Sequence, residues 1–147
     1  MIFERLGQLI ILLTLICGPV AFSQTTPIDI TTISSLDFGS ALPGDPALTL
    51  PNVNSETDQN ASFYITGQKN TSFTLSLPAE GTVQMITGTG VNLNQKISVT
   101  GFNYKPNNLK LSKSGDLYLY VSATRAALST DQVPGYYSTS FIITVIY

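Results

Sequence analysis

Residues 117–124 read Leu-Tyr-Leu-Tyr-Val-Ser-Ala-Thr, and this stretch decides the fold class. Every second side chain is apolar, beginning with Leu117, and the hydroxyl-bearing residues between them share the opposite face. A period of two is the period of a β-strand that has one buried and one exposed face. The stretch therefore predicts a two-faced strand.

The same alternation recurs along the chain after residue 24, between clusters of Gly, Pro, Asn and Asp, and no stretch there has an apolar period of 3.6 residues long enough for a helix. We expect residues 62–66 and 72–77 to pair as a hairpin, and residues 136–147 to form the longest strand. Further strands are expected at residues 28–31, 83–86 and 97–104, the last with a bulge at Gly101. The sequence thus predicts an all-β fold, an antiparallel β-sandwich of about 7–9 strands.

The first 23 residues have the order of a secretory signal peptide. A charged start at residues 1–8 is followed by an apolar run at residues 9–17 and by small residues at positions 21 and 23. The apolar run is about half the ~20 residues that a membrane-spanning helix needs. A lipoprotein anchor at Cys17 is the alternative, but a bulky branched residue precedes this cysteine. We predict cleavage after residue 23, a single domain over residues 24–147, and export to the periplasm, the outer cell surface or the medium, with no membrane span left.

Composition excludes several functions. The chain has no histidine, and its one cysteine lies in the predicted signal peptide, so the side chains that bind zinc and copper are missing from the remainder. Seven basic and nine acidic residues give a net charge of -2, which leaves no basic stripe for nucleic acid. No nucleophile stands beside a base, so we expect a protein that is not an enzyme and uses no cofactor or metal. Calcium binding by carboxylates such as Glu56 and Asp58 is left open.

Tyrosines are the candidate binding residues. Tyr118, Tyr120, Tyr136 and Tyr137 are expected on neighbouring late strands, where an exposed aromatic face could stack on a sugar or dock a protein. A soluble periplasmic or secreted domain that recognises a glycan or protein partner through this face is one functional hypothesis. The same tyrosines could instead fill or cover the sheets. Asp37, between Leu36 and Phe38, is expected to accept backbone N–H bonds in a turn.

Five phrases of the sequence form an ordered set. They are Ser35–Gly39 with Leu42–Gly44, Ala61–Gly67, Phe73–Pro78, Leu117–Thr124, and Pro134–Tyr137 leading into Phe141–Tyr147. Their order and spacing resemble a family of exported bacterial proteins catalogued as domain of unknown function 4402. That family is similar to fimbrial subunits and spore-coat-U-type domains, which implies an immunoglobulin-like, pilin-like sandwich. Many of those relatives have a disulfide, which the chain after residue 23 lacks.

The resemblance implies an exported, non-enzymatic structural or adhesive module of the bacterial cell surface, similar to a fimbrial subunit. An unpaired edge of such a sandwich exposes backbone groups with which a strand of an identical subunit can pair. Residues 24–33, with Ile28 and Ile30 as alternating apolar side chains, are the candidate strand. They either complete the domain's own fold or are donated to a neighbour, and both alternatives stay open at this point.

Overall fold

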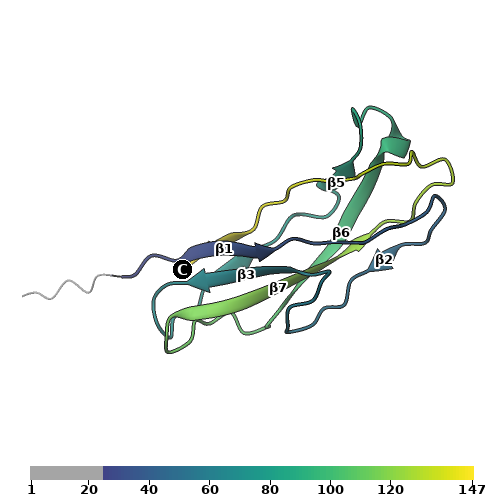
Figure 1. Cartoon of the computed structure of the whole chain (residues 1–147). Coiled ribbons are helices and arrows are strands. Elements are labelled where there is room, and N and C mark those ends of the chain that lie inside the picture. Colours follow the sequence, from purple (N-terminus) through teal and green to yellow (C-terminus); the bar gives the residue numbers. More distant parts are fainter. Residues whose placement is uncertain (1–24) are drawn as a thin grey trace, which may run out of the picture.

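The structure, a computed structural model, describes residues 25–147, and the predicted signal peptide and its cleavage site lie outside the described residues. The described part is all-β and antiparallel, which confirms the predicted fold class (Figure 1). One short 3-10 helix, η1 (Leu93–Gln95), lies among eight strands. The strands are β1 (Asp29–Ser34), β2 (Leu48–Thr49), β3 (Ala61–Thr66), β4 (Thr74–Ser76), β5 (Val83–Ile86), β6 (Lys96–Lys105), β7 (Asp116–Arg125) and β8 (Thr144–Ile146). Within residues 25–147 no helix is long and apolar enough to cross a membrane.

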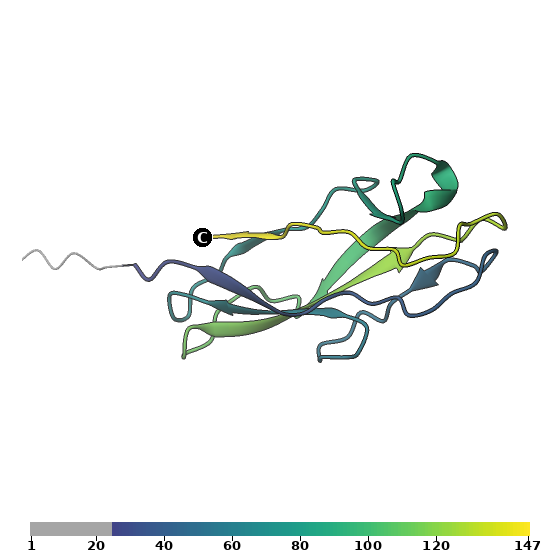
Figure 2. The same cartoon turned by 45° about the horizontal axis from the view of Figure 1, so that its top comes forward.

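Two sheets form the sandwich. The larger sheet has the strand order β1-β3-β7-β6-β5, and β2 pairs with the end of β7. The smaller sheet contains only β4 and β8. The C-terminal segment crosses over the larger sheet and contributes to the second layer, as its yellow trace shows in Figure 2. The second layer is therefore much less complete than the first.

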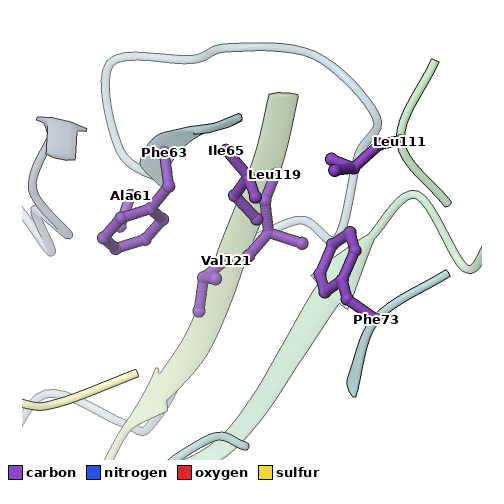
Figure 3. Packing of buried hydrophobic residues seen from close by; sticks show 7 residues of the cluster. All are labelled: Ala61, Phe63, Ile65, Phe73, Leu111, Leu119 and Val121. Carbon is purple, nitrogen blue, oxygen red and sulfur yellow. The ribbon is translucent and has the colours of Figure 1, made fainter. Parts of the chain in front are cut away.

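Strand β7 forms the centre of the larger sheet, and its alternation is the one predicted. Leu119 and Val121 are fully buried and Ala123 is 1% exposed, whereas Tyr118 on the other face is 53% exposed. The inward side chains of β7 pack with Phe63 and Ile65 of β3 and with the loop residues Phe73 and Leu111 (Figure 3). Most of the stability must come from this apolar burial, because it is the dominant favourable term in folding.

The predicted bulge at Gly101 is confirmed. The register between β6 and β7 shifts between Thr100 and Asn103, and Gly101 has a φ of 60°, which favours glycine. Phe102 lies within the shift, and its ring centroid is 5.2 Å from that of Phe141. The bulge thus lets β6 turn an aromatic ring toward the C-terminal segment.

The predicted hairpin of residues 62–66 and 72–77 is wrong. Within residues 25–147, β3 pairs with β1 and β7, whereas β4 pairs with β8 in the other sheet. The loop between β3 and β4 forms its backbone hydrogen bonds with the β6–β7 loop, including Gly67 N–H to the Gly115 carbonyl (2.9 Å) and Phe73 N–H to that of Leu109 (3.0 Å). These long-range bonds carry β4 into the second layer, where the buried Phe73 fills the space between the sheets.

The predicted long strand at residues 136–147 is also wrong in its extent, since only β8 is regular. An isolated bridge joins Ser138 to Ile86, and no backbone hydrogen bond holds residues 139–143 to another described segment. The reason is that a turn around residues 79–82 separates β4 from β5. Residues 136–147 therefore have no continuous strand beside them with which to pair. The apolar alternation survives nonetheless, since Phe141, Ile143 and Val145 pack against the core.

Candidate functional site

A groove of about 410 Å³ opens between the end of β1 and the C-terminal segment. Its floor is part of the hydrophobic core and includes Phe63, Val83 and Val99. Its walls are rich in hydroxyl groups, which come from residues 32–35 on one side and residues 136–140 on the other. No charged side chain of the described part of the chain lines it. The groove therefore fits an uncharged, partly apolar occupant.

Both long walls of the groove have backbone groups without a strand partner. Among the strands of residues 25–147, β1 lies at the edge of the larger sheet and pairs with β3 alone. On the other wall, residues 139–143 run without a backbone hydrogen bond to any segment of the described chain. Unpaired N–H and C=O groups at a sheet edge are a template for another strand.

Ile28 and Ile30 are placed in the chain's own fold. Ile30 lies in β1 opposite Ile65 of β3, and both isoleucines pack against the main core cluster. Of the two alternatives for residues 24–33, the structure thus contains the internal one for the described part of the segment. These residues complete one edge of the larger sheet and leave the groove beside it open.

A hydrogen-bonded clasp joins Tyr147 to the segment before β1 and to the start of the β3–β4 loop. The Tyr147 hydroxyl bonds to the backbone N–H of Gln68 and donates to the Thr26 carbonyl oxygen (3.0 Å). The Thr26 N–H in turn donates to the Gln68 side-chain oxygen (3.1 Å). None of the three residues lines the groove, which lies along the later part of β1 and the segment that follows it.

The predicted tyrosine face is only partly assembled. Tyr118 and Tyr120 do share the outer face of β7, but Tyr136 and Tyr137 lie in the irregular segment on the other layer and line the groove. They are not on a strand adjacent to β7, because the last strand pairs with β4 instead. The four residues thus divide between two surfaces.

Tyr136 and Tyr137 differ from each other in their surroundings. The Tyr136 side chain is 86% exposed, at the rim of the groove. The Tyr137 hydroxyl is fixed by hydrogen bonds with the backbone oxygens of Val133 (2.7 Å) and Asn94 (3.0 Å) and with the Gln132 amide (2.9 Å). Tyr137 is therefore a structural anchor for the segment, and only Tyr136 is free to contact a partner.

Tyr64 completes the outer face of β7 and was missed in the sequence. It lies opposite Tyr118 in the β3–β7 pair, and the two ring centroids are 4.9 Å apart at 45°. Its hydroxyl donates to Asp116 (3.3 Å), and burial together with the nearby Asp116 carboxylate raises the pKa of Tyr64 above the usual tyrosine value. The alternation of residues 63–65, with Phe63 and Ile65 inward, already placed Tyr64 outward.

Asp37 has the predicted turn role. Its side-chain oxygen accepts the Gly39 N–H (2.8 Å), and the Asp37 N–H donates to the Gln59 carbonyl (2.9 Å). Glu56 accepts a bond from the buried Ser62 hydroxyl (3.3 Å), so it too is tied to the sheet. Within residues 25–147 no three acidic side chains gather in a way that could hold a metal ion.

The fold and the groove define the class: an antiparallel β-sandwich domain whose second layer has an open edge. A family model described as Domain of unknown function (DUF4402) matches residues 44–147, and the chain belongs to this family. The match confirms the family resemblance inferred in the sequence, while the likeness to fimbrial subunits stays a prediction. No curated protein and no solved structure matches the chain.

Proposed function

We propose that this protein is an exported, non-enzymatic structural or adhesive module of the bacterial cell surface. The observation that carries the proposal is the open groove, with core side chains on its floor and unpaired backbone on both walls. The module joins another protein chain by accepting an extended strand in this groove, and identical subunits are the first candidate partners.

The incoming strand completes two kinds of interaction at once. Its backbone pairs with the edge of β1 or with residues 139–143, and its alternate side chains cover the apolar floor. Fully burying one aliphatic side chain contributes about 1.5–3 kcal/mol. Because none of the described residues that line the groove is charged, apolar side chains should face the floor, and a charge facing it would be strongly disfavoured.

Hydrogen exchange of the full chain tests strand addition. In the isolated protein we expect the amides of residues 139–143 to exchange much faster than those of β3. A synthetic peptide of residues 24–33 serves as the probe strand, and it should slow this exchange at millimolar concentration. A control peptide with Ile28 and Ile30 replaced by Asp should have no effect.

A variant that fills the groove gives the second arm of the test. Thr139→Trp places a bulky ring on an exposed wall residue of the groove and should abolish the protection by the peptide. Thr144→Trp is the matched control, because Thr144 is exposed on β8 and does not line the groove. If residues 139–143 are already as protected as β3 without peptide, or if Thr139→Trp leaves peptide protection unchanged, strand addition in this groove is refuted.

The outer face of β7 supports a second candidate function, recognition of a glycan or protein partner. The specific observation is the contact between the Tyr64 and Tyr118 rings on a face where Tyr118 remains half-exposed. Aromatic rings with one exposed side can stack on a sugar.

A glycan array compares the two tyrosine surfaces. Saturable binding of wild type should be lost in Tyr118→Ser and kept in Tyr136→Ser, because only Tyr118 belongs to the β7 face. Loss with Tyr136→Ser alone, or no binding at all, would count against this candidate.

A further inference from the structure

We propose that Met85 is an oxidation site that controls strand addition in the groove. A peroxide converts its thioether to a sulfoxide, and the groove then no longer accepts an apolar strand. This regulation rests on the proposed function, because it acts on the same groove. It needs no change of fold, since the oxygen is added to a side chain that the open groove exposes.

Met85 lies on the floor of the groove, where the C-terminal wall meets the larger sheet. It is opposite Ile97 in the β5–β6 pair, and it lines the groove together with Val83 of the same strand. The next residue, Ile86, exchanges two backbone hydrogen bonds with Ser138 of the wall (3.0 and 3.2 Å). The methionine side chain is therefore held beside the wall residues that an incoming strand meets.

The Met85 side chain is packed on one side and open on the other. It packs against the core cluster that contains Phe38, Leu50 and Ala123, yet it is only partly buried. Because it lines the groove, its remaining surface faces the space that the incoming strand occupies. A small peroxide molecule therefore reaches this side chain without unfolding of the domain.

Sulfur is scarce in this chain, which makes the oxidation selective. The sequence has one cysteine and two methionines, and it has no tryptophan or histidine. Cys17 and Met1 belong to the predicted signal peptide and lie outside the described residues. Met85 is thus the one sulfur-containing side chain of residues 25–147. Mild peroxide treatment should add oxygen there before it changes any other side chain of the domain.

The oxidation step needs only the thioether and the peroxide. A lone pair of the Met85 sulfur attacks one oxygen of hydrogen peroxide, so that an S–O bond forms and the O–O bond breaks. The sulfur is oxidised by two electrons and the peroxide is reduced. The departing hydroxide takes the proton from the transferred oxygen and leaves as water. Methionine sulfoxide reductases reverse this change.

The sulfoxide affects the free and the strand-bound groove unequally. In the open groove its oxygen points to water. Beneath a bound apolar strand the same oxygen lies among Phe38, Val83 and Val99, whose side chains have no hydrogen-bond donor. A buried acceptor without a donor corresponds to a dissociation constant that is higher by about 10-fold or more. Because a difference in affinity shifts the equilibrium, oxidation should release the strand.

Hydrogen exchange of the full chain before and after peroxide treatment tests the proposal. The probe is the peptide of residues 24–33, which contains no sulfur, and catalase removes the peroxide before the peptide is added. Peptide mapping by mass spectrometry first locates one added oxygen atom on Met85. Protection of residues 139–143 should then need about 10-fold more peptide or a greater excess. Treatment with methionine sulfoxide reductases should restore the original requirement.

Two variants at the same position separate polarity from shape. Met85→Leu nearly conserves the volume of the side chain, so it should bind the peptide like wild type both before and after peroxide treatment. It is also the matched control for oxidation of Cys17 and Met1, which it retains. Met85→Gln places a polar amide on the floor and should need more peptide than wild type without any oxidation.

The outcomes distinguish this regulation from strand addition itself. If unoxidised wild type shows no protection by the peptide, strand addition is refuted and its regulation with it. If unoxidised and oxidised wild type are protected at the same peptide concentration, strand addition stands and the role of Met85 is overturned. The role is also overturned if Met85→Leu becomes equally sensitive to peroxide. Faster exchange in β3 after oxidation, as large as that in residues 139–143, would assign the effect to unfolding and overturn it too.

Discussion

Replacing Leu119 by Ala should lower the free energy of unfolding by about 2–5 kcal/mol, which is the range for removing a fully buried leucine side chain from a close-packed core. Leu119 has no exposed surface, sits on the central strand β7, and belongs to the cluster that joins the two layers. Neighbouring side chains from β3 cannot move into the space without breaking their pairing with β7, so a cavity should remain.

Urea unfolding followed by circular dichroism measures this effect. The midpoint should fall while the slope stays close to that of wild type, because the same surface is exposed on unfolding. Leu93→Ala is the matched control, since Leu93 is 87% exposed and should change stability by no more than about 0.5 kcal/mol. Equal effects of the two substitutions would contradict the placement of the core. If Leu119→Ala fails to fold, Leu119→Val is measured instead, and its urea midpoint should lie clearly below that of wild type while the protein still folds.

The strands of the larger sheet could be predicted from the sequence because each has one buried face. In β7 and β6 the apolar residues alternate over many positions. A period of two therefore decides which side chains face the core and which face solvent. Gly101 was recognisable for a related reason, since a lone glycine within a strand pattern indicates a bulge. The face of a strand and the position of a bulge depend on neighbouring residues, so a short stretch of sequence is enough to predict them.

Strand partners could not be predicted in the same way. Residues 62–66 and 72–77 looked like a hairpin because they are close in sequence, but the β3–β4 loop is bonded to the β6–β7 loop instead. Residues 136–147 alternate like one long strand, yet regular pairing needs a continuous neighbour, which β4 and β5 do not provide. Both errors concern pairing between segments that are far apart in the chain. The alternation of a strand shows which of its faces is buried but does not show which strand lies beside it.

The candidate surfaces show the same limit. Ile28 and Ile30 were found by their alternation, but whether they paired inside the chain depended on β3. Alternation places Tyr118 and Tyr120 on one face of β7, but it does not show that the segment with Tyr136 lies on the other layer, because β8 pairs with β4. The groove was beyond prediction, since its floor and walls come from five separate stretches of the chain.

Gly115→Ala should be far more destabilising than Gly81→Ala, although both glycines have a positive φ. The φ of Gly115 is +89° and that of Gly81 is +75°, so both alanines pay about 1–2 kcal/mol for a left-handed backbone. Only at Gly115 does a Cβ collide, because it would lie 2.5 Å from the Gly67 carbonyl oxygen, whereas nothing lies within 4 Å at Gly81.

The alanine Cβ at position 115 would collide with a backbone atom, which cannot move aside as the end of a flexible side chain can. The Gly67 N–H donates to the Gly115 carbonyl, so moving either residue weakens the bond that directs the chain from β3 into the second layer. Overpacking of this kind costs a further ~1–3 kcal/mol. The urea midpoint of Gly115→Ala should therefore be lower than that of Gly81→Ala, by an amount that corresponds to the overpacking cost of ~1–3 kcal/mol. Equal midpoints would show that the β3–β4 and β6–β7 loops do not approach each other as closely at Gly67 and Gly115 as the structure places them.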